Sequence, residues 1–304
     1  MHNESGGGNN MAWMKLGQVE IGRAIESNGP FISIYDFFPD ATPEILAPHR
    51  HWLEPMALEP GTDKLLMPIQ SYVIRTPQNV VLVDSCVGNH KSVKWFPTWH
   101  QMEGNTYLPA LAALGLQPQD IDVVLCTHLH VDHSGWNTQW LDGRWRPTFS
   151  KARYILSRTE VAACEKLHRD YKDPTYAENV LPIIEAGQAV LVDDDHQIDD
   201  YVWLEPTPGH THGHCAVRVD GRGADAVVTG DLIHSPIQCR YPEWNFRHDA
   251  NKPLAAQTRR SFLERYSDCA TQVLTAHFPL PSAGAVKREG DAFRFDYWPA
   301  GRFI

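Results

Sequence analysis

The chain has 304 residues, of which 42% are hydrophobic and 10% aromatic, so it is long enough to bury a sizeable core. Its formal net charge is −10 and its basic residues form no cluster, which argues against a nucleic-acid-binding protein. No apolar run approaches the roughly 20 residues of a membrane span, and six scattered cysteines without a CxxC pair favour reduced thiols in a cytoplasmic protein.

The N-terminal part of the chain lacks a regular pattern. Residues 1–15 begin with a polar, glycine-rich stretch and are expected to form a flexible tail. A single domain is expected over residues 16–304, because no linker-like segment interrupts them. Within this domain, residues 36–66 hold many prolines, aromatic residues and charges without a clear period, which predicts a long loop.

Short β-rich runs alternate with a few helical segments through the rest of the chain. Strands are expected at residues 71–76, 80–85, 121–127, 153–157, 188–193, 201–207, 214–220, 225–231 and 271–277. Helical spacing predicts helices at 106–115, 158–170 and 253–268, and the basic residues of 258–265 fit the solvated face of the last one. Two blocks of strands, each finished by a helix, fit a four-layer α/β sandwich of two packed sheets with helices outside.

One short stretch, THLHVDHSG at residues 127–135, carries an unusual number of potential metal ligands. It follows an apolar run that predicts a buried strand. In an extended segment, His128 and His130 point to the same side because they are two residues apart, whereas Asp132 and His133 follow the turn. Imidazole and carboxylate groups are ligands that zinc favours. The pattern HxHxDH at a strand end therefore predicts a metal site.

Three further candidate ligands also follow apolar runs. They are His210 in TPGHTHGH, Asp231 in VVTGD and His277 in VLTAHFP. Because the pattern of a strand followed by a ligand repeats, these side chains are expected to complete a two-metal site.

These motifs, in this order and with VLVDS ahead of them, resemble the metallo-β-lactamase superfamily over about residues 70–280. The resemblance implies an αββα sandwich with the site along one edge of the sheets. It also implies two zinc ions, although iron, manganese or cobalt suit the same ligand types. Carried over by position, His128, His130 and His210 hold one metal, Asp132, His133 and His277 hold the other, and Asp231 bridges them.

Two neighbouring residues are expected to support the ligands. Asp84 corresponds to the superfamily's outer carboxylate, which orients a ligand histidine. Only one histidine of GHTHGH is needed as a ligand, so His214 is expected to form a structural hydrogen bond. Two divalent ions roughly 3.5–4 Å apart can share a hydroxide that attacks a carbonyl or phosphoryl centre near neutral pH. Asp132 is expected to help orient this hydroxide.

Several branches of the superfamily fit these residues poorly. The aspartate at the bridging position, Asp231, argues against a dedicated β-lactamase, and His130 argues against redox chemistry of the flavodiiron type. N-acyl homoserine lactonases and methyl parathion hydrolase-like enzymes have the most similar ligand pattern. Lactonases commonly carry a tyrosine three residues after the bridging aspartate, where this chain has His234. His234 is expected to act as a hydrogen-bond donor or acid near the leaving group, with a structural loop histidine as the alternative.

Aromatic residues in loops near the ligand segments predict an apolar or aromatic substrate. The expected pocket walls are Trp95, Phe96, Trp136 and Trp244, with Trp99, Phe37, Phe38 and Phe246 as further candidates. No lysine or arginine adjoins a ligand motif, so a strongly anionic substrate is disfavoured.

We therefore expect a dinuclear zinc hydrolase that cleaves lactones or other neutral esters, and the resemblance implies a homodimer. The first alternative is a phosphotriesterase of the methyl parathion hydrolase type, because the same hydroxide serves both reactions. The second is a glyoxalase II-like thioesterase, although no glutathione-binding region is recognised in residues 282–304. The third is a non-catalytic metal-binding protein, which the complete ligand set argues against.

Overall fold

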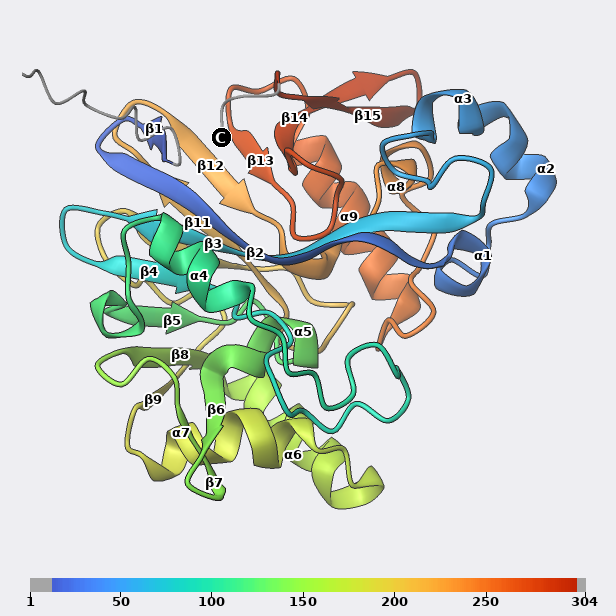
Figure 1. Ribbon diagram of the computed structural model, residues 1–304. Helices are drawn as coiled ribbons and strands as arrows, with labels where there is room; N and C mark the ends of the chain where they lie inside the picture. Colours follow the sequence, from blue (N-terminus) through green and yellow to red (C-terminus); the bar gives the residue numbers. More distant parts are fainter. Residues whose placement is uncertain (1–12, 300–304) are drawn as a thin grey trace, which may run out of the picture.

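The computed structural model describes residues 13–299. Two mixed β-sheets pack against each other, and helices cover their outer faces (Figure 1). The predicted four-layer α/β sandwich is therefore confirmed. Among the described residues, no helix is both long enough and apolar enough to cross a bilayer.

The first sheet has seven strands. In spatial order they are β1 (Met14–Leu16), β2 (Val19–Ser33), β3 (Lys64–Arg75), β4 (Val80–Val83), β5 (Val123–Leu125), β8 (Arg153–Ser157) and β9 (Ala189–Val192). The strands from β1 to β4 pair antiparallel, and those from β4 to β9 pair parallel. Parallel pairs need crossover connections, and these contain α4 (Tyr107–Ala113), α5 (Val131–Ser134), α6 (Arg158–Tyr171) and α7 (Leu181–Glu185).

The second sheet has six strands. They are β10 (Val202–Pro206), β11 (Cys215–Asp220), β12 (Asp225–Val228), β13 (Gln272–Leu274), β14 (Ala283–Glu289) and β15 (Ala292–Tyr297). Only β12 and β13 are parallel, and the helices α8 (Ile237–Arg240) and α9 (Lys252–Tyr266) lie in the connection between them. A separate hairpin pairs β6 (Thr138–Leu141) with β7 (Arg144–Pro147). Single turns of 3-10 helix span Ala47–His49, Pro118–Asp120, Gly135–Asn137 and Gly230–Leu232, and a π-helix spans Tyr176–Val180.

Alternation along the strands creates the buried layers. Val81 and Val83 of β4 join the apolar cluster between the two sheets, whereas Leu82 joins the cluster beneath α4. In the same way, Val227 of β12 packs beneath α9, while its neighbours face the other sheet. Because both faces of these strands are buried, their sequences read as continuous apolar runs.

The structure differs from the expectations mainly at the two ends of the chain. The predicted tail lies largely in residues 1–12, which are outside the described residues, while Met14 and Lys15 belong to β1. The predicted loop at 36–66 contains α1 (Ile34–Phe37), α2 (Pro43–Leu46) and α3 (Arg50–Leu53), which lie on the same side of the molecule as α8 (Figure 1). Helices of four residues are too short to show a period, yet their apolar side chains fill a buried cluster with Trp244.

Strands β2, β14 and β15 were also not anticipated. The predicted closing strand at 271–277 is β13, and the β14–β15 hairpin follows it. These strands carry many polar and charged residues, so their pairing in the sheet decides their conformation more than their own sequence pattern does.

The stretch that contains the first four candidate ligands is fastened to the loop after β4. The backbone N–H of Ser85 donates to the carbonyl of His133 at 2.8 Å. In return, the N–H groups of Gly135 and Trp136 donate to the carbonyls of Cys86 and Ser85, each at 2.8 Å. The two loops approach so closely that a Cβ on Gly135 would lie 1.7 Å from the carbonyl oxygen of Val87.

Replacing Gly135 by alanine is therefore expected to push these loops apart. We expect G135A to lower the free energy of unfolding by about 1–3 kcal/mol, the usual cost of overpacking, measured by urea denaturation. The matched control is G104A, where an added Cβ would lie 3.8 Å from the nearest heavy atom. Equal stability of G135A and G104A would contradict the steric argument.

Candidate metal centre

The seven side chains predicted as ligands meet at one edge of the two sheets. His128 and His130 follow β5, and Asp132 and His133 lie on α5. The other three come from the second half of the chain: His210 precedes β11, Asp231 lies in the turn after β12, and His277 follows β13. Their ligand atoms form two groups, each spanning less than 4.8 Å, and Asp231 belongs to both.

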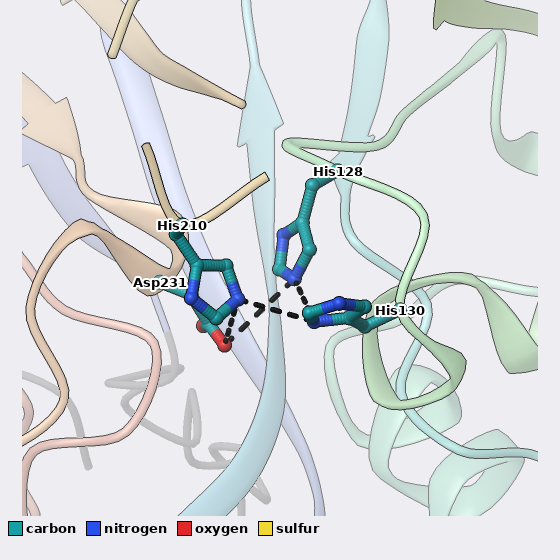
Figure 2. A group of neighbouring side chains, drawn as sticks. All are labelled: His128, His130, His210 and Asp231. Atoms are coloured by element: carbon teal, nitrogen blue, oxygen red, sulfur yellow. Dashed lines mark hydrogen bonds and ion pairs between the residues drawn. The ribbon is translucent and has the colours of Figure 1, made fainter. Parts of the chain in front are cut away.

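Three imidazole nitrogens and one carboxylate converge in the first group (Figure 2). His130 Nδ1 lies 3.0 Å from His128 Nε2 and 3.1 Å from His210 Nε2. The Oδ2 atom of Asp231 lies 3.4 Å from His210 Nε2 and 3.8 Å from His128 Nε2. Nitrogen lone pairs that point at one another are unfavourable unless a cation or a proton lies among them. This donor set therefore fits a divalent metal ion.

The second group gathers around the other oxygen of Asp231. Oδ1 lies 3.0 Å from His133 Nε2 and 3.0 Å from His277 Nε2. Despite these short distances, Oδ1 has no partner in hydrogen-bond geometry and is buried. Asp132 Oδ2 lies 3.6 Å from His133 Nε2 and 3.7 Å from His277 Nε2. One carboxylate that presents each oxygen to a different donor group has the arrangement of a bridging ligand.

In four of the five candidate ligand histidines, the ring nitrogen that faces away from the two groups is held by a hydrogen bond. Their partners are Asp84 for His133, Asp249 for His210, the Pro68 carbonyl for His277 and Thr127 for His128, at 2.8, 2.8, 3.0 and 3.1 Å. Such bonds fix the orientation of a ligand histidine and which nitrogen carries the proton. Asp84, which contacts the His133 ring, also accepts from the backbone N–H of Thr127 at 2.8 Å.

Burial and the carboxylates determine the protonation of the ligands. Burial lowers the pKa of His210 to about 4 and the pKa of His128 well below its ordinary value, so both rings are neutral at pH 7, as a ligand must be. Burial alone would also lower the pKa of His133, but Asp231, Asp132 and Asp84 raise it well above its ordinary value. Burial likewise opposes ionisation of Asp231, yet His133 and His277 hold its pKa well below the usual range.

Comparison with known proteins places this centre in a family. Residues 66–275 match the sequence pattern of the Metallo-beta-lactamase superfamily. The chain belongs to this superfamily. The resemblance predicted from the motifs is therefore confirmed. The protein is a metal-dependent hydrolase of this superfamily.

Relatives within the superfamily include two lactonases. The chain is 25% identical to an N-acyl homoserine lactonase of Bacillus cereus over 202 residues, which are 63% of this chain and 71% of the relative. It is 27% identical to an N-acyl homoserine lactonase of Bacillus thuringiensis over 204 residues, which are 64% of this chain and 72% of the relative.

Solved structures show the same fold. One is AidC, a dizinc quorum-quenching lactonase in complex with a product, with a TM-score of 0.76, 20% identity and coverage of 94% of this chain and 97% of AidC. Another is the hydrolase AbOPH of the beta lactamase superfamily, with a TM-score of 0.75, 20% identity and the same coverage of 94% and 97%.

Two residues that were not predicted, Asp249 and Arg259, lie outside the donor groups and support His210. Asp249, which holds His210, also accepts from the N–H of Phe246 at 3.0 Å and lies 3.5 Å from Arg259 Nη2. Arg259 is only 1% exposed and donates to the carbonyls of Leu232, Pro242 and Trp244. The expectation that the basic residues at 258–265 are all solvated is therefore wrong for Arg259. A basic residue on a helix usually faces water, and only the tertiary structure reveals its buried partners.

His214 and His234 contact Asp231 from two sides. His214 Nε2 accepts from the backbone N–H of Asp231 at 2.9 Å, and its Nδ1 lies 2.8 Å from Thr207 Oγ1. His214 thus holds the backbone of Asp231 and lies outside both donor groups. His234 Nε2 lies 3.2 Å from Asp231 Oδ2, while its Nδ1 is buried without a hydrogen-bond partner among the described residues.

Aromatic rings lie beside His234. The ring centroids of Phe37 and Phe246 lie 5.1 and 5.2 Å from the centroid of its imidazole, and they are 4.3 Å from each other. Phe31 lies 6.4 Å from Phe37 and extends this aromatic set. It in turn lies 4.9 Å from Phe96, one of the predicted pocket residues.

The tryptophans expected as pocket walls are placed differently. Trp136 is buried and stacks on Tyr107 at 5.5 Å. Trp244 is buried and stacks on Tyr241 at 4.5 Å. Both are therefore core residues, because proximity in sequence to a ligand does not determine which way a side chain points. Trp95 is 60% exposed.

Removing the charge of Asp249 tests whether it orients His210. D249N keeps the shape of the side chain but weakens the bond to His210 and leaves Arg259 without its buried carboxylate. We expect metal affinity to fall about 10–100-fold, measured by competition with a chromophoric chelator. The control is D193N, whose side chain is 86% exposed. Unchanged affinity in D249N would show that Asp249 does not act on the centre.

Proposed function

We propose that the protein is a dinuclear zinc hydrolase that opens lactones or cleaves other neutral esters. The observation that carries the proposal is the single carboxylate, Asp231, shared by two donor groups beside His234 and the apolar rings of Phe37 and Phe246. The lactonase relatives support it. Cytoplasmic location and homodimer formation remain predictions from the sequence.

The two donor groups would each bind one metal ion. His128, His130 and His210 would hold one ion, Asp132, His133 and His277 the other, and Asp231 both. When bound, two divalent ions supply water activation near neutral pH and polarise the oxygen of the substrate. Asp132 is 14% exposed in its side chain, more than Asp231 at 6%, so it is the ligand carboxylate better placed to accept a hydrogen bond from the attacking water.

His234 is proposed to serve the leaving group. Its Nε2 lies 3.2 Å from Asp231 Oδ2, and its Nδ1 has no hydrogen-bond partner among the described residues. A proton carried on Nδ1 could be donated to the leaving oxygen of the ester. The aromatic set of Phe31, Phe37 and Phe246 next to the ring favours an uncharged, apolar substrate.

Phosphotriester hydrolysis is the second candidate. It is favoured by the departure at His234, which stands at the position where lactonases commonly have a tyrosine. The two functions use the same metal groups and differ in the electrophile.

A substrate panel separates these candidates. With the zinc-saturated protein, we expect N-acyl homoserine lactones to be cleaved with a kcat/KM at least about 10-fold above that of an aryl phosphotriester or an S-acyl glutathione. Activity is expected to disappear in D231N, which removes the shared anionic ligand. Efficient phosphotriester turnover without lactone turnover would reject the first proposal in favour of the second.

The role of His234 predicts a dependence on the leaving group. H234Q is expected to lower kcat roughly 100-fold for lactones, whose alkoxide leaves poorly, and much less for nitrophenyl esters. Zinc content should stay unchanged. The control is H248Q, because His248 is an exposed histidine of the neighbouring loop. A uniform loss for both substrates would instead indicate that His234 only supports Asp231.

A further inference from the structure

A buried carboxylate at the start of α6 is not part of either donor group. Glu160 is only 4% exposed and lies in the first turn of the helix, where Ser157 Oγ accepts from its backbone N–H at 3.1 Å. Its side chain points away from solvent although no lysine, arginine or histidine among the described residues forms an ion pair with it. Two backbone groups from distant parts of the chain hold it instead.

Each oxygen of Glu160 binds one ligand loop. Oε2 accepts from the N–H of Leu129 at 3.2 Å, and Leu129 stands between the ligands His128 and His130. Oε1 accepts from the N–H of Gly213 at 2.7 Å, three residues after the ligand His210. A single side chain therefore connects the two loops that provide all the histidines of the first metal group.

The loop that contains His210 and Gly213 packs tightly against the start of α6. A Cβ on Gly213 would lie 2.6 Å from Ser157 Oγ and 2.7 Å from Thr159 Cβ. Only a glycine lets the loop approach the helix start closely enough for its N–H to reach Glu160. This steric fit is independent of the hydrogen bonds and points to the same close docking.

The chemistry of the two contacts requires a carboxylate. Both partners are N–H donors, and an ionised carboxylate accepts from both without presenting a hydrogen of its own. Its negative charge is also favoured at the N-terminus of a 14-residue helix. A glutamine of the same shape would direct its NH₂ group at one of the two N–H groups and lose that bond.

We propose that Glu160 is a positioning residue that sets the spacing between the two loops of the first metal group. The spacing matters because the 3.1 Å contact between His130 Nδ1 and His210 Nε2 joins one loop to the other. The second group depends on other supports, since His133 is held by Asp84 and His277 by the Pro68 carbonyl. Loss of the connection through Glu160 should therefore weaken one metal far more than the other.

Metal titration of the full chain tests this directly. In E160Q, zinc competition against a chromophoric chelator is expected to show one of the two ions bound about 10–100-fold more weakly, with the other nearly unchanged. E165Q is the matched control, because Glu165 is an exposed glutamate of the same helix. V161A is the stability control, because Val161 is a buried residue of that helix and its truncation removes packing without touching either loop contact.

A second measurement uses the metal-free protein and needs no activity, so it is independent of the proposed lactone hydrolysis. Amide hydrogen exchange at Leu129 and Gly213 is expected to be faster in E160Q than in E165Q or V161A. Equal weakening of both ions, to the extent seen in V161A, would reduce Glu160 to a general structural residue and overturn the proposal. Unchanged exchange at both amides would overturn it as well.

Discussion

The shared carboxylate of Asp231 is the constraint on which the arrangement of this protein depends. Each of its oxygens faces a different group of nitrogens, Oδ1 at 3.0 Å and Oδ2 at 3.4 and 3.8 Å, so ligands from separate strand ends have to meet at one point. A single sheet cannot supply them all, because three ligands come from the second half of the chain. Two sheets that pack face to face bring both sets of strand ends to the same edge.

Bringing so many donors together is unfavourable for the folded chain, and buried carboxylates around the centre offset part of that cost. Asp84 and Asp249 accept from ligand imidazoles, and Glu160 accepts from the backbone of two ligand loops. Each of these anions accepts from specific N–H groups of the protein. These contacts hold the geometry of the centre, while His234 and the phenylalanine rings beside it form the proposed substrate side.

The metal groups and the aromatic rings beside them would serve two different aspects of function, water activation and the choice of substrate. In the proposed hydrolysis, the metal groups would supply water activation, which serves esters, lactones and phosphotriesters alike. The choice among these substrates would then depend on the hydrogen bond offered to the leaving group and on the apolar wall. The residues proposed for these two roles, His234 and Phe37, lie in the segment after β12 and in α1.

The candidate metal ligands could be picked out from the sequence because each comes soon after an apolar strand, and an apolar run and the residues after it are local features. The same holds for Asp84, which directly follows β4. Asp249, Glu160 and the buried face of α9 were not predictable, because their roles come from contacts with residues far away in the chain. The sequence by itself determined which side chains could hold metal and which sheets carry them. Only the tertiary structure decided which buried charges support them and which aromatic rings reach the site, because these depend on the packing of distant segments.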